Sequence, residues 1–186
     1  MVAVFAKKCL SMIEGMEEMA FRARNVETGI IAADARATAL PDDTFGFILN
    51  HPPYFALYKY SSDVLRFELE WARYNRRQIR RNEIRDGFKT TRLDALDEYV
   101  ADMADVFAEA HRVLQPGGFL CLVVNNSTLR DVRLPVVERL TRRAESTGFT
   151  LRRHFDRAVR YAQASYHRSA RADKRVNRDH ILFFLK

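Results

Sequence analysis

The sequence predicts an α/β protein whose core is a parallel β-sheet. Short apolar runs typical of buried strands alternate with longer segments in which apolar residues recur at helical spacing. Alternation of this kind places helices against a sheet of parallel strands. The chain has 186 residues, 47% of them hydrophobic, which is enough for a substantial core. We therefore expect residues 1–186 to form a single domain.

The first third of the chain predicts one helix and two strands. Residues 5–23 carry apolar side chains at helical spacing, which indicates an amphipathic helix. Apolar runs at 29–33 and 45–49 predict short strands that end at Asp34 and Asn50. Because ligands bind at the carboxyl ends of strands in open α/β sheets, we expect Asp34 and the residues after Asn50 to lie together on the working edge.

The rest of the chain continues the alternation. Residues 61–82 predict a basic helix, and residues 94–113 trace one apolar helical face. The Pro-Gly-Gly turn at 116–118 ends that helix, with glycine supplying a positive φ. We further expect a loop at 86–91, strands at 119–124, 149–155 and 181–185, a helix at 132–146 and a polar loop at 165–179.

Composition limits the classes of function. No apolar run approaches the roughly 20 residues of a membrane span, so no membrane partner is expected. The charges near the N-terminus follow the apolar residues, the reverse of a signal peptide, which favours a cytoplasmic protein. Cys9 and Cys121 predict two free thiols, with no disulfide and no metal site. The net charge of +7 is concentrated in arginine-rich stretches at 66–92 and 152–178.

The first arginine-rich stretch predicts a contact with nucleic acid. Basic patches bind polyanions through the release of counterions. Several of these arginines share one face of the predicted helix, although a solvated helix face is the alternative interpretation. The residues expected to contact nucleic acid are Arg73, Arg76, Arg77, Arg80, Arg81 and, in the following loop, Lys89.

The most informative segment is Asn50-His51-Pro52-Pro53-Tyr54, directly after the strand predicted at 45–49. Each proline fixes φ and lacks an N–H, so this segment predicts a stiff ledge with carbonyls free to accept. The Tyr54 ring could stack on a nucleobase, while His51 and the Pro52 carbonyl accept hydrogen bonds from an exocyclic amino group. A simple proline turn after a strand is the alternative.

These segments and their order resemble the amino-group DNA methyltransferases, which methylate N4 of cytosine or N6 of adenine with S-adenosylmethionine (SAM). That family carries an Asp-Ala-Arg…Leu-Pro-Asp loop, similar to residues 34–36 and 40–42 here. Its (Asp/Asn/Ser)-Pro-Pro-(Tyr/Phe) catalytic loop is similar to residues 51–54, and its Arg-Val-Leu-x-Pro-Gly-Gly segment to residues 112–118. The resemblance runs from about Ile30 to the C-terminus and implies a Rossmann-like methyltransferase sheet.

The resemblance also implies roles for individual residues. Asp34 and Ala35 would bind SAM, with Asp34 accepting from the adenine amino group, and Asn50 to Tyr54 would form the catalytic loop. His51 stands where the family has Asp, Asn or Ser; a neutral imidazole can accept a hydrogen bond, whereas a protonated one cannot. Asn50 could share this task, and His51 could instead cap the turn. Asn125 and Asn126, after the strand at 119–124, could line the pocket or serve only a turn.

The glycine-rich Phe-x-Gly-x-Gly turn that holds SAM in this family does not occur in the sequence. The family's strand order is 3-2-1-4-5-7-6, and the first similarity is to strand three, so strands one and two are expected to be missing. Their loss would leave an apolar sheet edge unpaired. A second polypeptide or a second copy would then complete the sheet, or the chain is a truncated remnant. The sequence thus predicts SAM-dependent DNA methylation, with a non-catalytic nucleic-acid-binding subunit or an RNA or small-molecule methyltransferase as alternatives.

Overall fold

The chain divides into two units, Met1–Ala32 and Ala33–Lys186. The structure, a computed structural model, describes residues 2–22, 27–56, 60–84, 92, 94–129, 132–158 and 178–186. The first unit contains α1 (Val2–Arg22), which confirms the helix expected at 5–23. None of the described helices is both long enough and apolar enough to cross a bilayer. The expectation of a single domain stays a prediction.

The strand expected at 29–33 is wrong. Residues 27–33 form no regular secondary structure, and Ile30 and Ile31 are exposed. A strand requires a neighbour to pair with its backbone N–H and C=O groups. The described residues provide no such neighbour here: the only nearby bridge joins Asp34 to Ala37 within a turn. An apolar run without a pairing partner therefore stays outside the sheet.

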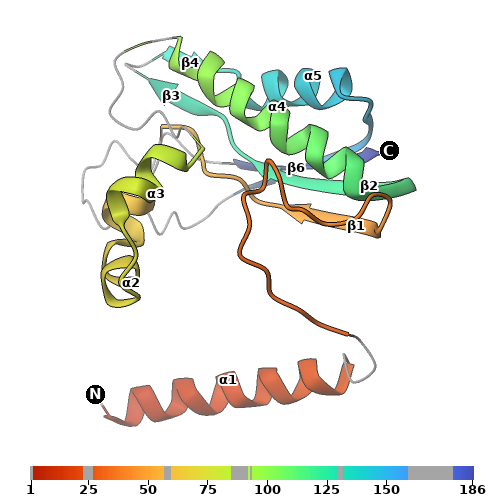
Figure 1. Ribbon diagram of the computed structural model, residues 1–186. Helices are drawn as coiled ribbons and strands as arrows, with labels where there is room; N and C mark the ends of the chain where they lie inside the picture. The colour runs from red at the N-terminus through yellow and green to blue at the C-terminus, as the bar shows by residue number, and fades with distance from the viewer. Residues whose placement is uncertain are drawn as a thin grey trace. The chain divides into compact units, whose positions relative to one another are not determined.

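The second unit is built on a four-stranded mixed sheet with the order β1-β2-β6-β5 (Figure 1). Its strands are β1 (Phe45–Asn50), β2 (Leu114–Val124), β5 (Thr150–Ala158) and β6 (Arg178–Leu185). The α/β class is confirmed. The order is the same as that of the last four strands, 4-5-7-6, in the order implied by the resemblance.

The direction of β6 corrects the expectation of a parallel sheet. β1 and β2 are parallel, but β6 runs antiparallel to both β2 and β5. β5 and β6 follow each other in the chain and pair directly. Parallel neighbours need a crossover connection that is usually helical, and the polar sequence between these two strands carries no apolar helical pattern.

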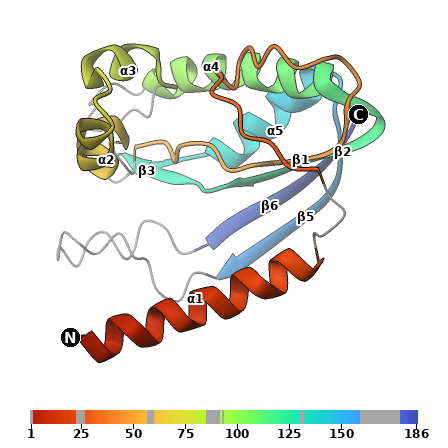
Figure 2. The same cartoon turned by 60° about the horizontal axis from the view of Figure 1, so that its bottom comes forward.

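Helices α4 (Ala95–Val113) and α5 (Val136–Ser146) cover one face of the sheet (Figure 2). Phe107 of α4 and Leu140 of α5 pack with Leu122 of β2 and Leu182 of β6, and all four side chains are fully buried. The helix expected at 94–113 is confirmed. Gly117 has the expected positive φ, but the Pro-Gly-Gly segment is not a turn after the helix: it lies within β2, where the register with β1 is irregular.

The helix expected at 132–146 begins four residues late, at Val136. The preceding residues form β4 (Val132–Leu134), which pairs antiparallel with β3 (Ser127–Leu129) in a small separate sheet. Pro135 lies at the boundary, and a residue before proline is biased toward the extended conformation. Apolar residues at 132 and 134 therefore belong to a strand rather than to the first turn of the helix.

The other face of the sheet is apolar and exposed. Phe47 and Leu49 of β1, Phe119 of β2 and Phe155 of β5 project from it and are 53%, 66%, 37% and 54% exposed. The helices α4 and α5 both lie on the opposite face. β1 also forms an edge, because β2 is its only neighbour among the described strands. Sheets with parallel strands are normally covered on both faces, so this surface is suited to contact with another polypeptide segment.

Glu109 of α4 accepts hydrogen bonds from the segment that precedes β1 and so links this segment to α4. Its Oε1 accepts from the Thr38 N–H at 2.7 Å and from the Thr38 hydroxyl at 2.5 Å, while Arg112 donates to both carboxylate oxygens at 2.7 and 2.9 Å. The hydrogen bonds from Arg112 and Thr38 lower the pKa of Glu109 from 4.5 to about 2. The charged carboxylate is thus favoured in the folded state.

We expect Glu109→Gln to make the free energy of unfolding less dependent on pH in the acidic range. Because the folded pKa lies below the unfolded one, the ionised Glu109 stabilises the fold fully above pH about 4.5, and this contribution is lost as the pH falls toward 2. Urea unfolding of the wild type and the variant between pH 7 and pH 2 should show a gap that closes across this window. Glu145→Gln, on an exposed part of α5, is the control and should leave the profile unchanged.

Candidate functional site

The loop after β1 places the predicted ledge at the carboxyl end of that strand. Asn50 is the last residue of β1 and pairs with Leu122. The rings of His51 and Tyr54 lie side by side, with centroids 5.0 Å apart and planes tilted by 39°. His51 is exposed, Pro52 is buried, and Pro53 and Tyr54 are half-buried. The structure therefore brings the two side chains expected to face a base into one place.

Hydrogen bonds from three elements hold this loop. The Tyr99 hydroxyl of α4 donates to the Pro53 carbonyl at 2.8 Å, and the Tyr54 N–H donates to the Tyr60 hydroxyl at 3.3 Å. The Ser127 hydroxyl of β3 donates to the Phe55 carbonyl. Burial raises the pKa of Tyr99, so its hydroxyl stays protonated and remains a donor.

The two proline carbonyls of the loop differ in their partners. The Pro53 carbonyl is occupied by Tyr99. In the described part of the chain, by contrast, no group donates to the Pro52 carbonyl, which is the carbonyl that the sequence singled out as an acceptor. A carbonyl oxygen without a donor can accept a hydrogen bond from an amino group that reaches it.

Asp179 is a site residue that the sequence did not reveal. It is the second residue of β6, is 6% exposed, and receives three donors. Its Oδ1 accepts from the Tyr54 hydroxyl at 3.0 Å and from Asn125 Nδ2 at 3.5 Å, and its Oδ2 accepts from Arg157 at 2.6 Å. The carboxylate raises the pKa of Arg157. Asp179 thus joins the ledge to β2, β5 and β6.

No sequence signal marked this contact. Asp179 falls at the end of the segment expected to be a polar loop, and Arg157 belongs to the second arginine-rich stretch, most of which (159–177) lies outside the described residues. Asn125 donates to Asp179 at 3.5 Å. Asn126 lines a cavity of about 580 Å³, and its Oδ1 also accepts from the Val137 N–H at the start of α5, at 3.0 Å.

Asp34 lies in a turn and not at the end of a strand. Its carboxylate accepts from Arg36 through Nε at 3.0 Å, a terminal guanidinium nitrogen at 2.7 Å and the backbone N–H at 2.9 Å, and these contacts lower the pKa of Asp34. Asp34 is therefore not at the carboxyl end of a strand, because the strand at 29–33 does not form. That Asp34 and the loop at 50–54 lie on one edge stays a prediction.

A cavity of about 570 Å³ adjoins this turn. Asp34, Ala35 and Arg36 form one wall, and the opposite wall comes from the region of α3. The polar residues on that wall are Tyr74, Asn75, Gln78, Asn82 and Glu83. The volume falls within the range of ligand-binding pockets, and the ionised Asp34 can accept from an amino group. The residues proposed for the adenine end of a cofactor therefore line a space of suitable size and chemistry.

The basic helix expected at 61–82 is broken into three pieces. A π-helical turn, η1 (Tyr60–Val64), is followed by α2 (Arg66–Trp71) and α3 (Arg76–Asn82). Asn75 caps α3 by accepting from the Gln78 N–H, which starts a new helix at this point. Arg73 lies in the connection with φ of 59°, so the expectation that it shares a helical face is wrong.

Ion pairs divide the four arginines of α3 into two groups. Arg76 pairs with Glu70 at 2.5 Å, and Arg80 pairs with Glu83. Arg77 and Arg81, one turn apart on α3, are exposed and have no acidic partner among the described residues. Lys89 lies outside the described residues. A free guanidinium can pair with phosphate without first breaking an internal contact, so Arg77 and Arg81 are the better candidates.

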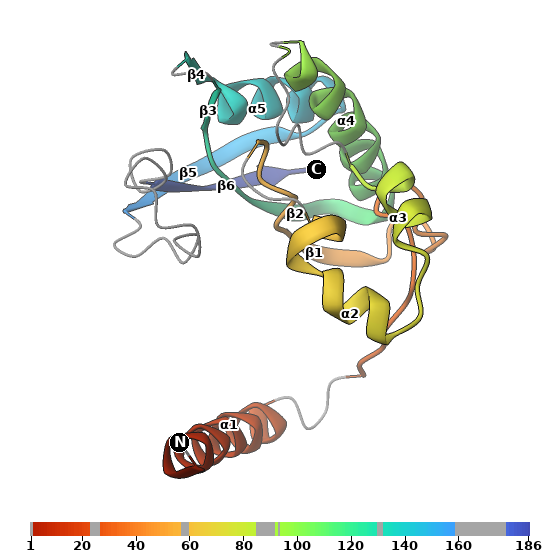
Figure 3. The same cartoon turned by 90° about the vertical axis from the view of Figure 1, so that its left-hand side faces the viewer.

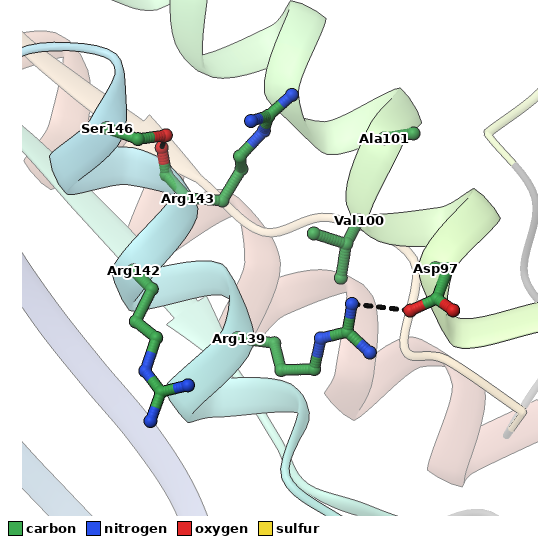
Figure 4. Close-up of a pocket in the computed structure, with 7 residues that line it drawn as sticks. All are labelled: Asp97, Val100, Ala101, Arg139, Arg142, Arg143 and Ser146. Carbon is green, nitrogen blue, oxygen red and sulfur yellow. Dashed lines mark hydrogen bonds and ion pairs between the residues drawn. The ribbon is translucent and has the colours of Figure 1, made fainter. Parts of the chain in front are cut away.

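A groove lined by several arginines lies between α4 and α5 (Figure 4). Its volume is about 450 Å³, and Arg139 of α5 reaches across it to Asp97 of α4 at 2.5 Å. Its other lining residues are Val100, Ala101, Arg142, Arg143 and Ser146. No residue that the sequence assigned to a site lines this groove, so it is separate from the ledge and from the cavity at Asp34.

Comparison with known proteins identifies the fold. No family model and no curated protein matches the sequence. The PvuII DNA methyltransferase, which is cytosine-N4-specific, superposes with a TM-score of 0.54 at 15% identity, covering 82% of this chain and 47% of its own. A proposed DNA modification methylase from Thermus thermophilus gives 0.51 at 18% identity, covering 83% and 52%. The same protein complexed with S-adenosyl-L-methionine gives 0.50, covering 83% and 54%.

These likenesses show that the second unit has a methyltransferase-like α/β fold with a mixed sheet. At 15–18% identity they establish the fold and not the activity. The chain spans about half the length of the solved structures that it matches.

Proposed function

We propose that this chain carries the base-binding part of a SAM-dependent methyltransferase that acts on an exocyclic amino group of a DNA base, N4 of cytosine or N6 of adenine. The loop from Asn50 to Tyr54 carries this proposal, because it is held by Tyr99, Tyr60 and Asp179 and its Pro52 carbonyl receives no hydrogen bond from a described residue. The fold neighbours support it: one is cytosine-N4-specific, and another was solved with SAM.

The chemistry follows from the open acceptors. The lone pair of an exocyclic amino group is delocalised into the base, which makes the nitrogen a poor nucleophile. Acceptors at the Pro52 carbonyl and at neutral His51 would hold the two amino hydrogens and localise the lone pair on nitrogen. Tyr54 would stack on a base that has left the duplex. SAM would supply the methyl group, and the residues that fit its adenine end are Asp34 and Ala35.

We propose further that a second polypeptide, or a second copy of this chain, completes the sheet. The exposed side chains of Phe47 and Leu49 and the unpaired edge of β1 support this proposal. The strand order supports it as well, since β1-β2-β6-β5 accounts for only the second half of the order implied by the resemblance. The residues that would hold the methionine end of SAM are expected on that other segment. Isolated chain should accordingly bind SAM weakly in calorimetry.

The experiment is methyl transfer to DNA, measured by mass spectrometry of the released nucleosides. We expect Tyr54→Ala to weaken base binding by about 1–3 kcal/mol, the usual cost of losing an aromatic stacking partner. His51→Ala should act mainly on kcat, because it removes an acceptor that orients the reacting amino group. His154→Ala, on β5 away from the loop, is the matched control. Full activity in both Tyr54→Ala and His51→Ala would contradict the assignment of this loop to base binding.

One observation favours a second candidate function. The exposed Arg77 and Arg81, which have no acidic partner among the described residues, would equally serve a non-catalytic subunit or remnant that binds nucleic acid without holding SAM. Such a protein would bind DNA, fail to transfer methyl groups under any reconstitution, and still depend on Tyr54 for binding. Parallel titrations with RNA and DNA of one sequence separate a DNA enzyme from an RNA methyltransferase.

Replacing Arg77 and Arg81 together by Gln should weaken DNA binding and flatten its dependence on salt. Each phosphate contact adds about 0.9 to the slope of log affinity against log salt on duplex DNA, so the loss of two contacts should lower the slope by about 2. Fluorescence anisotropy between roughly 50 and 200 mM salt measures it. The matched control is Arg92→Gln with Arg142→Gln, which removes equal charge from exposed residues outside α3 that are already paired with acids. Equal salt slopes for the two double variants would contradict the division of these arginines into acid-paired residues and those with no acidic partner in the described part of the chain.

A further inference from the structure

The segment from Tyr60 to Ile84, here called the arm, exposes three large aromatic side chains. Phe67 and Trp71 of α2 are 74% and 90% exposed, and Tyr74 in the connection to α3 is 62% exposed. No residue of α2 or α3 is buried. Aromatic side chains of this size usually bury most of their surface. A group of them on one exposed segment indicates a contact surface rather than part of a core.

The fold of the arm holds these rings in a defined arrangement. Phe67 and Trp71 are four residues apart and share one face of α2. Glu70 pairs with Arg66 of α2 and with Arg76 of α3, and the Tyr74 N–H donates to the Leu69 carbonyl at 2.8 Å. These bonds set the connection between the two short helices (Figure 3). The ordered connection between α2 and α3 therefore holds the aromatic side chains in place.

The same arm also carries positive charge, which indicates the kind of ligand. Arg77 and Arg81 are exposed and have no acidic partner within the described chain, and the Arg66 guanidinium lies 5.8 Å from the centroid of the Phe67 ring. Sites for unpaired nucleic acid combine aromatic faces, on which bases stack, with cations that follow the phosphates. A duplex offers its phosphates but keeps its bases stacked inside, so exposed rings would gain little from it.

We propose that the arm is a binding site for unpaired nucleobases, in which Phe67 and Trp71 stack on bases of a single strand and Arg77 and Arg81 contact its phosphates. The inference rests on the proposed function in that the ligand is nucleic acid, and it adds the form of that ligand. Enzymes that act on a base either take single-stranded substrate or turn one base out of a duplex, and the arm suits the first case. The arm would retain such a strand while Tyr54 holds the target base.

Trp71 is the only tryptophan in the chain, so the site contains its own reporter. The test titrates the full chain with a dodecamer of thymidylate and with a duplex of equal length, and follows tryptophan fluorescence. Stacking should quench Trp71 with the single strand and much less with the duplex. In anisotropy with a labelled dodecamer, Trp71→Ala and Phe67→Ala should each weaken binding roughly 5- to 150-fold. Phe155→Ala, which removes a 54% exposed aromatic side chain from the sheet, should not.

Several results would overturn the inference. Unquenched Trp71, equal affinity for duplex and single strand, or unchanged affinity in both arm variants would each exclude base stacking. A change in sedimentation coefficient on Trp71→Ala, without a change in DNA affinity, would assign the aromatic side chains to a protein contact instead. Tyr54→Ala separates the two proposals, because it should leave Trp71 quenching intact. Failure of methyl transfer in a reconstituted complex that binds SAM, with quenching retained, would therefore count against the proposed activity alone.

Discussion

Replacing Tyr99 by alanine is expected to lower the free energy of unfolding by about 3–5 kcal/mol, the range for deleting a buried aromatic side chain. Tyr99 is 1% exposed, and its ring packs against Phe55 with centroids 5.4 Å apart. The substitution opens a cavity under the ledge and also leaves the Pro53 carbonyl without its donor. Urea denaturation followed by circular dichroism measures the loss.

Tyr99→Phe separates the two contributions. It keeps the ring in the core and removes only the hydroxyl, so it should cost about 1 kcal/mol, the net contribution of one hydrogen bond. Tyr99→Phe should fold and still weaken base binding, because the Pro53 carbonyl loses its hydrogen-bond donor. If Tyr99→Phe were as destabilising as Tyr99→Ala, the hydrogen bond and not the packing of the ring would dominate.

The second large effect is expected at Asp179. Asp179→Ala should lower the free energy of unfolding by about 1.5–3 kcal/mol, because a hydrogen bond from Tyr54 to a charged acceptor is lost. The ion pair with Arg157 adds little, since that side chain is 69% exposed and the pair is screened by solvent. The same change frees the Tyr54 ring and should weaken base binding.

A double-mutant cycle with Tyr54→Phe tests this contact directly. If the Tyr54 hydroxyl bonds to Asp179, Asp179→Ala should cost about 1 kcal/mol less in the Tyr54→Phe background than in the wild type. Asp156→Ala is the control, because Asp156 pairs with Arg178 at an exposed position of the same two strands and should change stability by less than about 0.5 kcal/mol. Additive effects at Tyr54 and Asp179 would refute the coupling.

Local chemistry made several features of this protein predictable from the sequence. The proline pair follows β1 in a loop, Gly117 takes the expected positive φ, and the apolar stripe of α4 faces the sheet. Each of these depends on residues that are close in the chain, through fixed backbone angles or a helical repeat. The alternation of strands and helices predicted the α/β class for the same reason.

Tertiary structure alone decided which residues meet. Tyr54 and Asp179 are 125 positions apart, and only the pairing of β6 beside β2 brings that carboxylate to the ledge. The apolar run at 29–33 remained outside the sheet because strand formation requires a partner that no local pattern supplies. Arg76 and Arg77 are neighbours in sequence, yet among the described residues only Arg76 has an acidic partner, because the turn between α2 and α3 brings Glu70 to it.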